Sequence, residues 1–159
     1  MLTPDTTLRL SPHFTLAELC ASTTAQARGI DNTPAPELLP RLIMLAEMLE
    51  RIRSVVGQPI VVSSGYRCPQ LNALVGGATT SDHPQGHAAD ITAPKFGSPT
   101  ELARLLAPLV STLSIGQIIL EGVRGKQWVH VSTHVPERQA NRVITITDAG
   151  VVAGIQDLA

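Results

Sequence analysis

The sequence predicts an α+β domain in which an antiparallel sheet packs against helices. Helical patterns come early in the chain and strand patterns come late, and the last three strand candidates follow one another without a helix. A length of 159 residues with 43% hydrophobic residues suits one domain with its own core. We expect that domain at residues 13–159, after a loosely held lead at residues 1–12.

The first half of the chain carries the clearest helix signals. Thr15 and Glu18 fit a capping box that opens a short helix. Prolines at 34, 36 and 40 then mark a loop and the first turn of a long helix, which Gly57 ends. Apolar residues keep helical spacing along this helix, so we expect them in the core: Leu42, Leu45, Ala46, Leu49, Ile52 and Val56.

The second half contains most of the strand signals and a long polar loop. Residues 65–86 are rich in Gly, Ser, Thr, Asn and Pro, with at most a helical turn at 69–75, and so long a loop in a compact domain is usually functional. Ser98 and Glu101 start another helix, which we expect to reach Leu113 with a bend at Pro108. The strands are expected at 59–64, 87–92, 116–121, 127–132 and 142–147.

Composition argues against several classes of partner. With 16% charged residues and a formal net charge of −1, the chain has no basic excess for nucleic acid or anionic lipid. We see neither a membrane-spanning apolar run nor a secretory signal, and therefore expect synthesis in the cytoplasm. We also expect the protein to be a monomer. Cys20 and Cys68 are read as free buried thiols, although a single bridge between them stays open.

Three residues have the composition of a catalytic zinc site. His83 lies in the polar loop, Asp90 in the following strand, and His130 in the strand at 127–132. Two imidazoles and one carboxylate leave a fourth zinc position to water. Alternation along this strand puts Trp128, His130 and Ser132 on one face and leaves the intervening valines for the core.

A hairpin argument adds a candidate base to this site. If strands 116–121 and 127–132 pair through an even-length turn around Arg124, Glu121 lies opposite Trp128 and shares a face with His130. Glu121 could then take a proton from zinc-bound water. An odd-length turn or a bulge would instead turn Glu121 away.

The run SGYRCPQLNALVGGATTSDHPQGHAADI, together with WVHVS, resembles the M15 family of zinc D-Ala-D-Ala carboxypeptidases and dipeptidases. The similarity covers most of residues 12–133 and looks closest to the small phage and prophage branch. The motif that carries it is specific because a later W-x-H accompanies Ser81, His83, Gly86, Ala88 and Asp90. The resemblance implies the compact α+β fold shared with the hedgehog signalling domain.

The resemblance also implies roles for individual residues. It makes His83, Asp90 and His130 the ligands of a Zn²⁺ cofactor, Arg67 the group that holds the scissile carbonyl, and Ser81 a substrate-seating residue. Many members place the catalytic acid three residues before the last histidine ligand, where this chain has Gln127. An amide cannot act as a base, so Glu121 fills the role or the site is inactive; we adopt Glu121.

The remaining candidates have weaker signals. Trp128 is either a wall of the substrate pocket, which we adopt, or a packing residue. We expect Asn72 to organise its loop, His87 to lie at the rim, and His13 and His134 to lie at the surface without partners.

The expected function is zinc-dependent hydrolysis of an amide bond in peptidoglycan stem peptides, at D-Ala-D-Ala or L-Ala-D-Glu. The cell wall would be reached after holin-type release, as by an endolysin, or from a virion. Two alternatives remain: a non-catalytic zinc-containing module that binds peptide or peptidoglycan, and a virion or assembly component of a phage.

Overall fold

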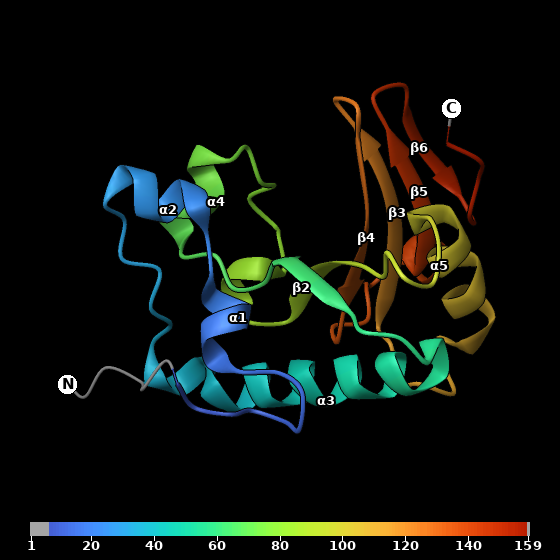
Figure 1. Ribbon diagram of the computed structural model, residues 1–159. Helices are drawn as coiled ribbons and strands as arrows, with labels where there is room; N and C mark the ends of the chain where they lie inside the picture. The colour runs from blue at the N-terminus through green and yellow to red at the C-terminus, as the bar shows by residue number, and fades with distance from the viewer. Residues whose placement is uncertain (1–6, 159) are drawn as a thin grey trace.

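The structure is a computed structural model that describes residues 7–158, and it confirms the α+β class (Figure 1). Its helices are α1 Leu16–Cys20, α2 Thr23–Arg28, α3 Leu39–Val56, α4 Pro69–Leu74 and α5 Pro99–Leu106. The strands form one sheet in the order β1-β2-β4-β3-β5-β6. They are β1 Val61–Ser64, β2 Ala88–Thr92, β3 Gln117–Val123, β4 Lys126–Ser132, β5 Val143–Thr147 and β6 Gly150–Ala153.

The helix boundaries follow the local signals in the sequence. Capping boxes open α1 at Thr15 and α5 at Ser98, and Gly57 ends α3 with a left-handed φ of 69°. Helix α5 stops at Leu106, short of the expected Leu113, and the chain continues as a 3-10 turn at Ala107–Leu109. Pro108 explains the difference, because it has no N–H to donate to the preceding turn.

The sheet is mixed, whereas an entirely antiparallel sheet was expected. Strands β3 and β5 pair in parallel, while every other pairing is antiparallel. The reason lies in β4, which has β2 on one edge and β3 on the other. Strand β4 ends beside the start of β3, so the chain that leaves β4 reaches the free edge of β3 at that end. Strand β5 therefore runs along β3 in the same direction.

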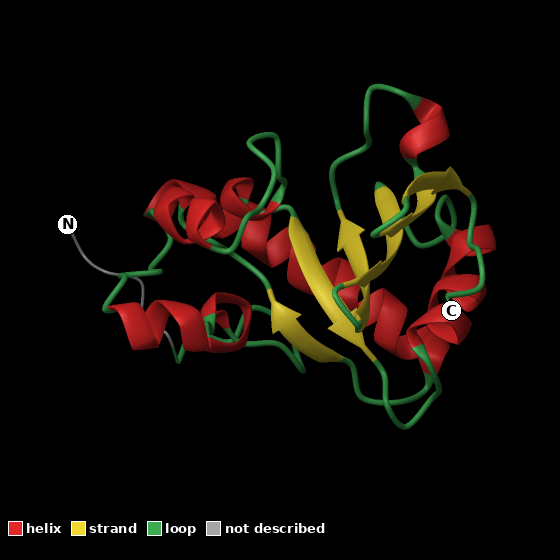
Figure 2. Cartoon of the chain, turned by 90° about the horizontal axis from the view of Figure 1, so that it is seen from above, coloured by secondary structure: helices red, strands yellow, loops and turns green. Residues whose placement is uncertain are grey.

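The two faces of the sheet have different surroundings. Helices α3 and α5 cover one face, and all six apolar residues expected on the long helix are buried there (Figures 1 and 2). Alternate residues of β3 and β4 meet these helices: Ile118, Leu120, Val129 and Val131. The residues between them, including Glu121 and His130, therefore point to the opposite face.

The N-terminal segment and the cysteines were also the subject of expectations. The expected loose lead falls in part on residues 1–6, outside the described residues; beyond them Arg9 bridges to Thr15 and Leu10 is buried. Cys20 and Cys68 are both free and half-buried. Among residues 7–158, no helix combines the length and apolar character needed to cross a membrane.

Candidate active site

The sheet face opposite the helices forms the floor of a cleft of about 980 Å³. Strands β3 and β4 supply Glu121, Trp128 and His130 to its lining, and the loop after α4 supplies the segment around Ser81 and His83. The cleft also extends to the connection between β4 and β5. Every site residue expected from the sequence lies in this cleft.

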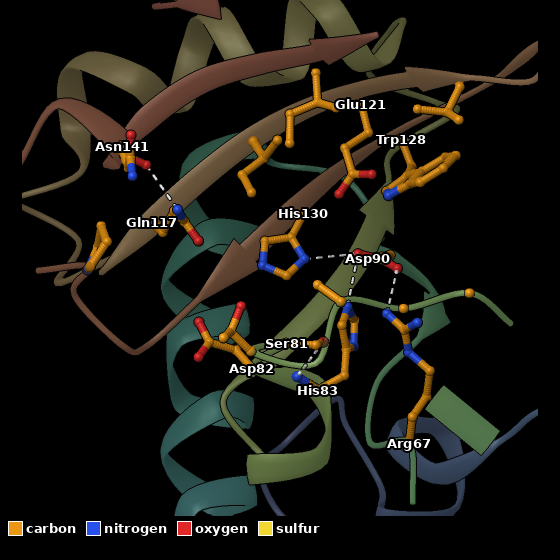
Figure 3. Close-up of a pocket in the computed structure, with 18 of the residues that line it drawn as sticks. Arg67, Ser81, Asp82, His83, Asp90, Gln117, Glu121, Trp128, His130 and Asn141 are labelled. Atoms are coloured by element: carbon orange, nitrogen blue, oxygen red, sulfur yellow. Dashed lines mark hydrogen bonds and ion pairs between the residues drawn. The ribbon is translucent and has the colours of Figure 1, made fainter. Parts of the chain in front are cut away.

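Three of these side chains converge on one point (Figure 3). The Asp90 Oδ1 atom lies 3.3 Å from His83 Nε2 and 3.1 Å from His130 Nδ1. One ligand atom from each of the three residues falls within 4.8 Å of the others. Bonds of the usual zinc length in a tetrahedron separate neighbouring ligand atoms by about 3.3 Å. The donor set and its spacing therefore fit a zinc ion.

The backbone fixes each of the three side chains. Asp90 on β2 and His130 on β4 are direct partners across the sheet. His83 begins a 3-10 turn, and its Nδ1 lies 2.6 Å from the carbonyl oxygen of Gly65. That contact makes Nδ1 the protonated nitrogen and leaves Nε2 free for a metal, the usual arrangement around ligating histidines.

Gly65 can hold this carbonyl only because it has no side chain. A Cβ at this position would collide with the backbone carbonyl of Leu19 at the end of α1. The next residue, Tyr66, donates its backbone N–H to the same Leu19 carbonyl. The ligand loop is thus seated directly on α1, and the glycine is required by close approach.

Charges in the site are strongly coupled. Burial raises the pKa of Asp90, but its contacts with His130 and His83 outweigh burial and hold that pKa well below its ordinary value. Burial lowers the pKa of His83, and the contact with Asp90 only partly opposes this. Burial also lowers the pKa of His130, but Asp90 outweighs it and raises that pKa. An ionised carboxylate at the centre favours a bound cation.

Arg67 lies beside this centre and is oriented by Asn32, a residue that no sequence motif marks. Its Nη2 is 3.7 Å from Asp90 Oδ2, on the side away from the histidines. Asn32 donates from Nδ2 to the carbonyls of Cys20 and Tyr66 and accepts the Cys68 N–H at Oδ1. Both neighbours of Arg67 in the chain are therefore clamped by one side chain.

Glu121 occupies the position that the hairpin argument expected. It pairs with Trp128, and Ile119 pairs with His130, because the turn at Arg124 and Gly125 has two residues with positive φ. Burial raises the pKa of Glu121, and the Asp90 charge adds to the rise. A carboxylate whose pKa is raised toward neutrality suits proton transfer at physiological pH.

Gln127, three residues before His130, does not line the cleft. It is exposed and lies between two cleft-lining residues, Lys126 and Trp128, so alternation directs its side chain to the other face. Ser81 does line the cleft, and its Oγ accepts the His83 backbone N–H at 3.3 Å. Its hydroxyl thus supports the ligand turn in addition to facing the cleft.

Two further polar residues join the ligand turn to the sheet. Ser132 on β4 is fully buried and donates to Asp82 Oδ2 at 2.7 Å, and His134 Nδ1 lies 3.0 Å from Asp82 Oδ1. His134 therefore has a partner, contrary to expectation, and so does His13, whose Nδ1 lies 2.8 Å from Glu50. These pairings join residues 37 and 52 positions apart, which sequence spacing does not show.

Asn72 organises its loop as expected, and His87 lies beside His134, a residue that lines the cleft. Asn72 donates to the Ala78 carbonyl within the cleft loop, and His87 stacks on His134 with a Nδ1 contact to Thr133. Neither side chain lies in the group of metal-ligating atoms.

Comparisons with known proteins agree with this geometry. A model of the Peptidase M15 family matches residues 12–132, about three quarters of the chain and all the residues of the metal group. The zinc D-Ala-D-Ala carboxypeptidase of Streptomyces albus G is 34% identical over 86 residues, which is 54% of this chain. The matched segment spans only 33% of that relative's length.

Proposed function

The chain belongs to the M15 peptidase family, and on that basis we propose that it is a zinc metallopeptidase acting on peptidoglycan stem peptides. The name of the Streptomyces relative supports both the metal and the substrate class. The D-Ala-D-Ala terminus is the bond which that name favours, and the L-Ala-D-Glu bond is the second candidate. We also propose that the protein acts at the cell wall and comes from a phage.

One observation carries the proposal: the two histidines and Asp90 converge at zinc-like spacing in an open cleft, with Glu121 on the same face. His83, Asp90 and His130 would hold the ion. A zinc ion held there would polarise the substrate carbonyl and make a coordinated water more acidic. The cleft, at about 980 Å³, has room for a peptide beside this centre.

The protein's own residues supply the remaining chemistry. Glu121 accepts a proton from the attacking water at its carboxylate and passes it to the leaving amine as the amide bond breaks. Arg67 donates from its guanidinium to the carbonyl oxygen as negative charge develops there, and such a donor contributes about 3–4 kcal/mol to the transition state. Ser81 and Trp128 line the cleft, and we expect both to contact the bound peptide.

The main alternative is a module that binds zinc and peptide without cleavage. Gln127 at the usual acid position is the observation that favours it. The two proposals differ in the role of one residue: a hydrolase requires Glu121, whereas a binding module does not.

The deciding experiment measures zinc content together with hydrolysis of purified peptidoglycan and of a D-Ala-D-Ala-terminated peptide. It compares the native protein, the chelated protein, Glu121→Gln, and Glu47→Gln as a control on the exposed side of α3. We expect one zinc per chain, activity lost on chelation and in Glu121→Gln, and full activity in the control. Bound zinc with no turnover of either substrate by the native protein would support the binding module instead.

A further inference from the structure

We propose that Trp128 is a positioning residue whose indole N–H donates to the Glu121 carboxylate and holds it toward the metal centre. This role is separate from contact with substrate, and it rests on the proposed function of Glu121 as the base.

The indole N–H is buried without a hydrogen-bond partner. Trp128 Nε1 is one of only four side-chain nitrogen or oxygen atoms in residues 7–158 that are fully buried and unpartnered. Burying an N–H without an acceptor is unfavourable, so such donors are rare unless an acceptor lies within reach of a small movement. The position of Glu121 supplies that acceptor.

Glu121 and Trp128 are direct partners across β3 and β4, so their Cβ atoms are neighbours on the cleft face. In Figure 3 the indole nitrogen points toward the Glu121 carboxylate. The interaction with this N–H lowers the pKa of Glu121, against the effects of burial and of Asp90. The other charged groups acting on Glu121 are Arg67 and His130.

In these surroundings the indole N–H can hold the direction of the Glu121 carboxylate. Asp90 repels the Glu121 carboxylate, while His130 and Arg67 attract it from the metal side. A donor on the strand partner anchors the carboxylate from the other side and fixes its direction. Without it the carboxylate could turn outward, so its loss should lower kcat more than it raises KM.

The chain contains a single tryptophan, so replacing every tryptophan changes this side chain alone. Growth with benzothienylalanine exchanges the N–H for sulfur at nearly unchanged ring shape, and 5-fluorotryptophan is the matched control that keeps the N–H. Losing a hydrogen bond to a charged group should lower kcat roughly tenfold or more. We expect that fall, with KM little changed, for benzothienylalanine only. Equal kcat in both analogues would overturn the proposal. The analogues are used in place of Trp128→Phe because that substitution could disturb packing.

A second readout does not depend on activity. The single indole N–H gives one resonance in a ¹H–¹⁵N NMR spectrum of the zinc-loaded protein. We expect this resonance to move upfield and its proton to exchange faster in Glu121→Ala, and to stay unchanged in Glu47→Ala. An indole resonance that is the same in the native protein and in Glu121→Ala would refute the contact. An inactive native protein that nevertheless shows the expected NMR change would count against the proposed function and not against the contact.

Discussion

The side chain of Asn32 should control both the stability of the domain and the placement of Arg67. It makes three hydrogen bonds, at 2.9 Å to the Cys20 carbonyl, 3.0 Å to the Tyr66 carbonyl and 2.7 Å from the Cys68 N–H. Asn32→Ala removes all three at once. Each contributes about 1 kcal/mol net, and the partly exposed position lets water replace some of this, so we expect a loss of about 2–3 kcal/mol.

Chemical denaturation in urea measures this change directly. For a chain of this size the same loss corresponds to a fall in Tm of roughly 4–12 °C. Because Tyr66 and Cys68 flank Arg67, kcat on a stem-peptide substrate should also fall in the folded variant. Asn32→Asp is the matched variant: it keeps an acceptor for Cys68 but places a charge against two carbonyls. A free energy of unfolding for Asn32→Ala within about 0.5 kcal/mol of the native value would refute the reasoning.

Three other predictions concern separate parts of the molecule. Gly65→Ala displaces the carbonyl that orients His83 and should weaken zinc binding roughly 10- to 100-fold in a chelator competition; unchanged affinity would contradict the proposed contact. Burial raises the pKa of Glu50, but hydrogen bonds from Ser11 and His13 outweigh it and lower that pKa. Its ionised form thus stabilises the fold above the ordinary glutamate pKa of about 4.3. The stability difference from Glu50→Gln in urea should begin to shrink below that pH and be lost as the pH falls through the lowered pKa of Glu50 in the folded protein. A difference that is constant with pH would be inconsistent with this. Burial raises the pKa of Cys20 to about 12, so iodoacetamide at mildly alkaline pH should label it only after unfolding; equal labelling of the folded protein would show that the thiol is accessible.

The sequence predicted the parts of the site that depend on local patterns. Alternation along β4 was enough to put His130 on the open face. An even-length turn, one of the two cases that the sequence left open, puts Glu121 opposite Trp128, as the structure shows. Capping signals placed the starts of α1 and α5. The family resemblance joined these local results to Asp90 and His83.

Contacts between distant segments could not be predicted. Asn32 lies in a proline-rich loop and acts on segments 12 and 34–36 positions away, with no motif that marks it. Asp82 and Ser132 meet only because the ligand turn packs on β4. The parallel pairing of β5 was missed for the same reason, since it depends on which strand edges are already occupied. Strand β6 was missed because its four residues are all exposed and show no alternation.

The most direct test of the account is a zinc titration of the metal-free protein, following hydrolysis of a D-Ala-D-Ala-terminated peptide at each addition. Activity should rise in proportion to zinc and level off at one ion per chain. Glu121→Gln should bind the same single ion and stay inactive. Activity that does not respond to zinc, or Glu121→Gln turning over substrate at the native rate, would contradict the account.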